Sequence, residues 1–281
     1  MAFSLAKMLL ALSLLGSALA QAAEPVKYRF SPVNQYGINL TAEYWNPIVA
    51  YVAEKSGVPL ELKIGRTSAD TTAYVIAQEV EFVFSNHLFS PEREKMGWKV
   101  FGRRQTPAIH SQIVVPSDSP VTELSQLQGE EVVFAGPEAL VIYKFPYAHL
   151  LSKNIAVKPV FAGNNDAALA QLFNRKAAAA GSHSQLVAAY AAREGKTYRV
   201  LWSGPAVHDL ALMAASDVPE KTVRAVSNAF VQMQTDPRGK AILESASKLV
   251  ALPTDTRFIA SDGSEYGAYR DFYRTAPASL R

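Results

Sequence analysis

Short β-prone runs alternate with helical stretches along most of this chain, and this alternation constrains the fold more than any other feature. Alternating strands and helices predict α/β lobes whose mostly parallel sheets are flanked by helices. The predicted strands are residues 26–30, 60–64, 81–84, 99–101, 110–115, 131–135, 158–161, 177–180, 198–202 and 210–214. Helices are predicted at 40–55, 70–78, 121–127, 141–152, 167–174, 185–193 and 220–234, with further helical segments to the C-terminus.

The composition is that of a folded protein and excludes several kinds of site. Hydrophobic residues make up 49% of the 281 residues, and cysteine is absent. A chain without cysteine has no thiolate nucleophile, no Fe–S cluster and no cysteine-ligated zinc. The 28 basic and 25 acidic side chains are scattered through the sequence, so the formal net charge of +3 indicates no nucleic-acid partner.

Residues 1–20 have the pattern of a secretory signal peptide. Lys7 precedes an apolar run at 8–15, and the small residues Ala18 and Ala20 stand at the −3 and −1 positions of a cleavage site. The apolar run is short for a membrane span, so an uncleaved anchor is the weaker alternative. No cysteine follows the cleavage site to carry a lipid. We therefore expect an exported protein of the periplasm.

Loops at the carboxyl ends of the predicted strands are the expected ligand-binding positions. Two α/β lobes in one chain predict a cleft between them, and ligands of open α/β sheets bind at these strand ends. Several of the loops combine small residues with polar residues that can cap a helix or face a ligand. They are residues 31–37, 85–87, 136–139, 163–166, 181–184 and 204–209.

Four sequence motifs resemble those of the phosphate/phosphite/phosphonate solute-binding proteins of ABC transporters. They are Trp45-Asn46-Pro47-Ile48, Ser117-Asp118-Ser119-Pro120, Phe145-Pro146, and the run from Phe161 through Gly163-Asn164-Asn165-Asp166 to Ala168. The resemblance implies a two-lobed periplasmic-binding-protein type II fold, with lobe 1 at 21–110 plus 205–281 and lobe 2 at 111–204. It implies hinge crossings near 111–115 and 201–204, and domain closure around one small solute.

The chain departs from this family where the family binds its anion. The family carries Ser-Thr-Ser at the positions that Ala139, Leu140 and Val141 occupy here, and Glu138 adds a carboxylate beside them. A buried phosphonate dianion needs charge-assisted partners and tolerates a nearby carboxylate poorly. The departure therefore indicates a ligand that is less charged, cationic or zwitterionic. Asp209 matches an acidic contact of the family, and two carboxylates would suit an amine or amidine.

The candidate ligand contacts come from these loops and from the family positions. Each has a structural alternative as well: Asn165 can cap a helix, Tyr143 can pack between helices, and Glu138 can complement a helix N-terminus. Asn165 stands where the family often has histidine. The candidates are Tyr36, Ser85, Asn86, His87, Glu138, Ala139, Tyr143, Asn165, His183, His208 and Asp209.

An enzymatic role is not expected. His87, His183 and His208, together with the two acids, could form a metal site, but no His-Glu-x-x-His pair supports one. The chain has no P-loop, and the segment 181–185 lacks the final glycine of a nucleophile elbow. We expect a monomeric receptor without a cofactor that delivers a small solute to an ABC permease. The alternatives are a sensor subunit that binds the periplasmic domain of a membrane histidine kinase, or a metal-binding periplasmic protein.

Overall fold

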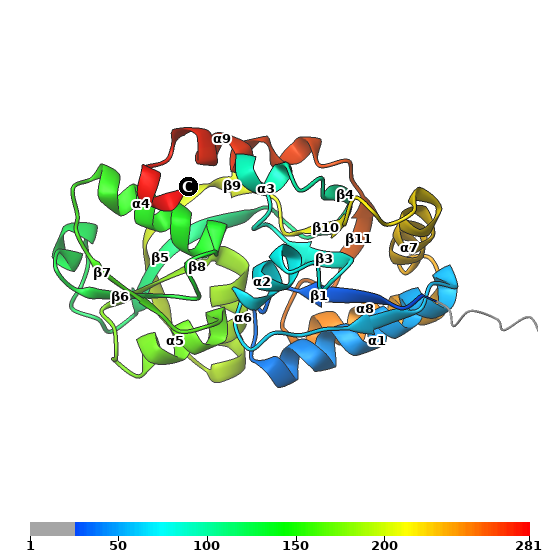
Figure 1. The fold of residues 1–281 in the computed structure, drawn as a ribbon. Helices are drawn as coiled ribbons and strands as arrows, with labels where there is room; N and C mark the ends of the chain where they lie inside the picture. Colours follow the sequence, from blue (N-terminus) through cyan, green and yellow to red (C-terminus); the bar gives the residue numbers. More distant parts are fainter. Residues whose placement is uncertain (1–25) are drawn as a thin grey trace, which may run out of the picture.

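Two sheets flanked by helices build the molecule, as the computed structural model of residues 26–281 shows (Figure 1). We call the six-stranded sheet with its helices the first lobe and the five-stranded sheet with its helices the second lobe. The strands are β1 (Tyr28–Pro32), β2 (Leu60–Leu62), β3 (Phe82–Ser85), β4 (Lys99–Gln105), β5 (Ile109–Pro116), β6 (Glu131–Phe134), β7 (Lys158–Phe161), β8 (Ala179–His183), β9 (Tyr198–Val207), β10 (Ala211–Ala214) and β11 (Arg257–Ala260).

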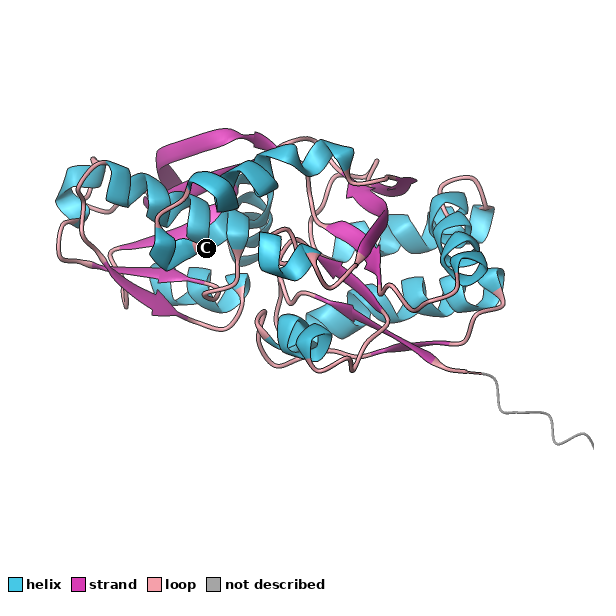
Figure 2. Ribbon diagram, turned by 45° about the horizontal axis from the view of Figure 1, so that its top comes forward, coloured by secondary structure: helices cyan, strands magenta, loops and turns pink. Residues whose placement is uncertain are grey.

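The helices cover the faces of both sheets, as Figure 2 shows. The α-helices are α1 (Ile38–Ser56), α2 (Asp70–Ile76), α3 (Pro91–Glu94), α4 (Phe145–Ser152), α5 (Asn165–Phe173), α6 (Ser184–Glu194), α7 (Glu220–Gln232), α8 (Pro237–Leu249) and α9 (Gly267–Thr275). The shorter elements are the 3₁₀ turns η1 (Leu124–Leu127), η3 (Ser264–Tyr266) and η4 (Ala278–Leu280) and the π-helix η2 (Leu140–Lys144). Helix α1 ends where Gly57 adopts a φ of 68°, a conformation that costs glycine little.

Each lobe repeats the same three-strand parallel unit. In the first lobe β2 and β3 flank β1, and in the second lobe β7 and β8 flank β6. Helices connect these strands, which is the arrangement that parallel pairing requires. The α/β fold predicted from the alternation is thus confirmed, and both units come from its most regular stretches.

The prediction of mostly parallel sheets is wrong, because each sheet is mixed. Strand β10 runs antiparallel between β3 and β4, and β11 pairs antiparallel with β4. In the second sheet, β5 runs antiparallel to both β8 and β9. Strands β5 and β10 enter their sheets from the other lobe, and β11 follows the two helices α7 and α8. None of them comes from the βα crossover that imposes parallel pairing.

The chain passes between the sheets at residues 106–108, after β4, and again at 208–210, before β10. The crossings expected near 111–115 and 201–204 instead lie inside β5 and β9 of the second sheet. A third connection follows α9, which runs along one side of the molecule in red (Figure 1). The C-terminal residues Ala276 and Leu280 pack in the apolar core of the second lobe beside Ile113.

Other local predictions differ from the structure as well. The segment 121–127 forms only the 3₁₀ turn η1, and the helix expected at 141–152 begins with the π-helix η2. The C-terminal part, expected to be helical after 234, contains strand β11. Its four residues pair with β4, a partner more than 150 positions earlier that local sequence does not reveal.

Alternating side chains place two apolar cores on the two faces of each sheet. In β3, Phe82 and Phe84 pack in the core that contains α1, whereas Val83 packs in a cluster with Tyr266 and Tyr269. This second cluster also contains Leu140 of the second lobe, so apolar packing joins the two lobes. Alternation of this kind follows from the two-residue period of a strand.

The predicted signal peptide lies outside the residues that the structure describes. Within residues 26–281, none of the helices has the length and hydrophobicity that a membrane span requires.

Candidate functional site

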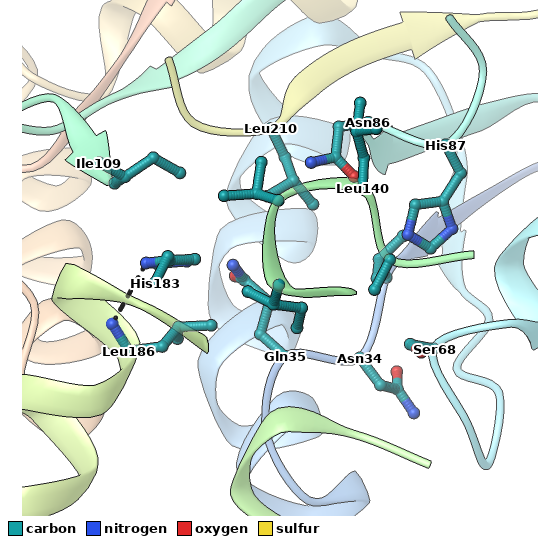
Figure 3. Close-up of a pocket in the computed structure, with 14 residues that line it drawn as sticks. Asn34, Gln35, Ser68, Asn86, His87, Ile109, Leu140, His183, Leu186 and Leu210 are labelled. Atoms are coloured by element: carbon teal, nitrogen blue, oxygen red, sulfur yellow. Dashed lines mark hydrogen bonds between the residues drawn. The ribbon is translucent and has the colours of Figure 1, made fainter. Parts of the chain in front are cut away.

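A cavity lined by residues of both lobes lies where the two lobes meet. Its walls come from the loops after β1, β2, β3 and β6, from the end of β8 with the first turn of α6, from the start of β5 and from the crossing at 208–210 (Figure 3). These are the strand ends at which α/β proteins bind ligands. The lining residues are Val33, Asn34, Gln35, Ser68, Asn86, His87, Ile109, Ala139, Leu140, Val141, Ile142, His183, Leu186 and Leu210.

Five polar residues of the first lobe form one side of the cavity, which we call the polar wall: Asn34, Gln35, Ser68, Asn86 and His87. Asn34 Nδ2 donates a 2.6 Å hydrogen bond to the carbonyl oxygen of Gly65, and its buried Oδ1 has no partner within the described residues. The buried hydroxyl of Ser68 is likewise unpartnered. Two polar atoms of this wall are therefore available to a ligand.

A buried ion pair fixes the orientation of Gln35. Arg104 Nε donates to Asp209 Oδ2 at 2.6 Å, and Arg104 Nη2 donates to Gln35 Oε1 at 2.9 Å. Burial opposes the positive charge of Arg104, but the nearby Asp209 carboxylate outweighs it and raises the pKa of the guanidinium. Because Oε1 accepts from Arg104, the amide nitrogen of Gln35 is the atom left to donate elsewhere.

His87 is held neutral in the polar wall. Burial lowers the pKa of its imidazole to about 3. Its Nδ1 lies 3.0 Å from the hydroxyl oxygen of Thr72, and its backbone N–H donates to Ser85 Oγ at 3.0 Å. The carbonyl of the same residue accepts a 2.7 Å hydrogen bond from Arg93. These contacts fix both the backbone and the ring at the cavity.

Residues of the second lobe form the opposite side, which we call the apolar wall: Ile109, Ala139, Leu140, Val141, Ile142 and Leu186, with His183 as its polar member. Ala139 is the N-cap of η2 and supplies no side-chain cap. The backbone N–H groups of Leu140, Val141 and Ile142 lie in the first turn of η2, where no carbonyl of the same helix can accept their hydrogen bonds. The wall is therefore apolar in its side chains but presents backbone donors.

His183 is the N-cap of α6, and its ring has a defined tautomer. The imidazole Nδ1 accepts a 3.3 Å hydrogen bond from the backbone N–H of Leu186, which leaves the proton on Nε2. Burial lowers its pKa to about 4, so the ring is neutral at pH 7. Nε2 is buried and unpartnered within the described residues, and it supplies the wall's one side-chain donor.

Four of the eleven predicted contacts line the cavity, namely Asn86, His87, Ala139 and His183. The other seven lie elsewhere. Ser85 binds the His87 backbone, and Asn165 accepts a 2.7 Å hydrogen bond from Ser182. His208 contributes its carbonyl oxygen to the hydroxyl of Tyr269.

The predicted aromatic contacts pack inside the lobes. Tyr36 is buried with its ring against Tyr44, at a centroid distance of 6.3 Å. Tyr143 packs against Phe134 and Phe161 in the core of the second lobe. Both rings fill space between elements and do not line the cavity.

The two carboxylates expected to bind a cationic ligand already have partners in the protein. Glu138 Oε2 lies 2.6 Å from Arg93 Nη1, and Asp209 is paired with the buried Arg104. Burial opposes ionisation of Glu138, but Arg93 outweighs it and holds the pKa of the carboxyl below its ordinary value. Neither carboxylate therefore lines the cavity in this structure, and the sequence does not show which arginine each one meets.

Asn34, Gln35, Ser68, Ile109, Leu186 and Leu210 line the cavity but were absent from the predicted contacts. A sequence signal existed for Asn34 and Gln35, which follow directly after a strand, although ordinary loop hydrogen bonding explained them equally well. Ser68 lacks such a signal because five residues separate it from the end of β2 at Leu62. Within residues 26–281, no group of three or more histidine and acidic side chains is placed to hold a metal ion.

Residues 31–266 match the model of the phosphonate periplasmic substrate-binding proteins of ABC transporters. The chain belongs to this family. Its members are periplasmic and take part in transport, so the resemblance inferred from the motifs is confirmed. No curated protein matches the chain.

Solved structures share the fold of this chain. A binding protein component of an ABC phosphonate transporter from Pseudomonas aeruginosa is 14% identical with a TM-score of 0.74, over 89% of this chain and 87% of that one. PhnD1 from Prochlorococcus marinus, in complex with methylphosphonate, is 13% identical with a TM-score of 0.72, over 88% and 97%. A Xanthomonas citri protein bound to ATP is 14% identical with a TM-score of 0.64, over 89% and 98%. Such distant similarity establishes the shared fold.

Proposed function

We propose that this protein captures a small solute in the cavity between its lobes and delivers it to the permease of an ABC importer. The observation that carries the proposal is the cavity itself, where polar atoms of Asn34, Ser68 and His183 are buried without a partner among the described residues 26–281. Buried polar groups are normally hydrogen-bonded, and an unpaired one is costly. A ligand that pairs with these atoms removes that cost.

Closure of the lobes around the solute is the expected mechanism, and specific contacts across the lobes support it. The backbone N–H of Ser68 donates to the carbonyl of Gly163 at 2.7 Å, and Arg93 pairs with Glu138. Leu140 and Val141 enter the apolar cluster that contains Val83 of the first lobe. Opening at the crossings 106–108 and 208–210 would separate these pairs, so the closed arrangement has its own stabilising contacts.

The partner is the transmembrane permease of the importer, because the family works in ABC transport. The closed arrangement brings surfaces of both lobes into one fixed relation, which a permease can distinguish from the open one. We further propose that the protein acts as a monomer, since one chain supplies both walls of the cavity.

The proposal can be tested by native mass spectrometry of the exported protein purified from the periplasm. We expect a bound small molecule that is released on unfolding. The variant Ala139→Phe, which fills the cavity, should lose it while remaining folded by circular dichroism. Ala241→Phe, at an exposed position of α8, is the matched control and should retain it. Equal occupancy in the two variants would contradict the proposal.

A further inference from the structure

The cavity lining contains no residue with a formal charge. Of its fourteen residues, eight are apolar, and the six polar ones are amides, a hydroxyl and two histidines. Burial lowers the pKa of both histidines to about 3 and about 4, so both rings are neutral near pH 7. A charged ligand would therefore meet no counter-charge on the wall that it contacts.

The charged side chains behind the walls are engaged with one another. Arg93 pairs with Glu138, and Arg104 pairs with Asp209 while also bonding Tyr44 and Gln35. Lys144 lies with its Nζ 4.8 Å from the ring centre of Tyr273 and 3.5 Å from its hydroxyl. Recruiting any of these groups to a ligand would break an existing contact, and breaking the fully buried Arg104–Asp209 pair would be strongly destabilising.

The polar atoms left open define a pattern of donors and acceptors. His183 Nε2 and the amide nitrogen of Gln35 are donors, because Nδ1 and Oε1 of these residues already accept hydrogen bonds. The first-turn N–H groups of η2 add backbone donors. Asn34 Oδ1 is an acceptor because its Nδ2 donates to Gly65, and the hydroxyl of Ser68 serves either role.

The remaining contact surface is aliphatic. Leu140, Val141 and Ile142 from η2 face the same cavity as Ile109, Leu186 and Leu210. This set favours a hydrocarbon portion in the ligand, because burying apolar surface there removes it from water. In Figure 3 these aliphatic side chains and the polar ones surround the same space from both lobes.

We propose that the ligand is a small uncharged molecule with an apolar body, at least one hydrogen-bond acceptor and at least one donor, of the amide or alcohol class. This inference rests on the proposed function and names the solute class for the same cavity. An acceptor of the ligand would meet His183 and Gln35, and a donor would meet Asn34. For a phosphonate dianion, the apolar wall provides neither the counter-charge nor the side-chain hydroxyls that such a ligand would need.

Matched pairs that differ in charge but little in shape test the inference. We suggest propionamide with propionate, lactamide with lactate, and propanol with propylammonium. Binding at pH 7 is measured by ligand-observed NMR on protein freed of small molecules by unfolding and refolding. We expect the neutral member to bind at least tenfold more tightly in every pair that binds.

Two variants show whether the named atoms make the contacts. Ser68→Ala removes a hydroxyl that has no partner in the protein, so it should leave Tm unchanged or raise it while weakening the neutral ligand at least threefold. His183→Asn keeps an oxygen that can cap α6 but removes the Nε2 donor, and it should also weaken binding. Ser125→Ala, at an exposed serine, is the control and should change neither quantity.

Each outcome decides the inference. Tighter binding of the neutral members, weakened by Ser68→Ala, supports it. Tighter binding of a charged member that Ala139→Phe abolishes overturns the inference while leaving the proposed receptor function standing. Binding of neither member in any pair overturns the inference too, and the mass-spectrometry experiment then decides separately on the proposed function.

Discussion

The polar wall and the apolar wall differ in what holds their side chains. In the polar wall, Gln35 and His87 are fixed by Arg104, Thr72 and Ser85, so a network of the first lobe orients them. In the apolar wall, Leu140 and Val141 are fixed by packing at the start of η2. Directional bonds orient a ligand, whereas apolar packing mainly excludes water. In the proposed receptor, the first lobe therefore supplies most of the polar side chains, and the second lobe covers the solute and adds the donor of His183.

The same comparison explains why nearby charges do not reach the cavity. The pairs Arg104–Asp209 and Arg93–Glu138 lie behind the walls, the first joining β4 to the crossing at 208–210 and the second between the lobes. Their charges stabilise the arrangement of the walls, and the uncharged atoms in front of them remain free for the ligand. Ionic groups here position the site instead of lining it.

Removing the support of the polar wall should have the largest effect. Asp209→Asn leaves the buried Arg104 without its carboxylate, and breaking a buried ion pair in this way costs about 3–5 kcal/mol of unfolding free energy. The midpoint of urea unfolding measures it, and ligand affinity should fall too because Gln35 loses its fixed partner. The matched control is Glu220→Gln in an exposed pair on α7, for which the cost is about 0.3–0.5 kcal/mol. Equal losses of unfolding free energy in the two variants would show that the buried Arg104–Asp209 pair contributes no more than an exposed pair.

The two histidines, one in each wall, should make stability depend on pH. Burial lowers the pKa of His87 to about 3 and that of His183 to about 4, whereas the unfolded chain takes up these protons near pH 6.5. The unfolded state therefore binds more protons below pH 6.5. As the pH is lowered, the free energy of unfolding decreases by up to about 1.4 kcal/mol per pH unit for each histidine. Urea unfolding between pH 7 and pH 5 measures the slope. His87→Gln and His183→Asn should each remove about half of it, and an unchanged slope in both would contradict the assignment.

Breaking the ion pair between the lobes should have the smallest effect. Glu138→Gln removes the charge that meets Arg93 across the lobes, and we expect ligand affinity to fall about fivefold, or about 1 kcal/mol. Because the pKa of Glu138 lies below its ordinary value, the bond is complete above about pH 4.3 and is lost as pH falls below that. Glu265→Gln breaks a comparably buried pair with Arg103 inside the first lobe, so it should leave affinity unchanged. Equal loss of affinity in both variants would show that the bond between lobes is not special.

Much of the fold could be predicted from the sequence because it depends on local pattern. The units of β2, β1 and β3 and of β7, β6 and β8 come from regular alternation of strands and helices. Strands β10 and β11 break that regularity, since their partners are set by contacts between distant segments. Local periodicity gives the type of an element but not its neighbours.

The candidate site was predictable only in part for a related reason. Asn86 and His87 come directly after β3 and His183 is the last residue of β8, so their place at a strand end already brings them to the cavity. Ala139 reaches it from the loop that follows β6. Ser68 and Leu186 reach it through the packing of whole helices and loops. Asp209 has an acidic family counterpart in the ligand site, yet here a buried arginine from β4 takes its carboxylate.

The sequence by itself determined the α/β class, the family and the loss of side-chain hydroxyls at Ala139, Leu140 and Val141, because these depend on residue identity and order. Only the tertiary structure decided which polar atoms remain unpaired. Within residues 26–281, Asn34 Oδ1, Ser68 Oγ and His183 Nε2 are buried without a hydrogen-bond partner. Hydrogen bonding is a property of pairs of atoms, and for residues far apart in the chain those pairs exist only once it has folded.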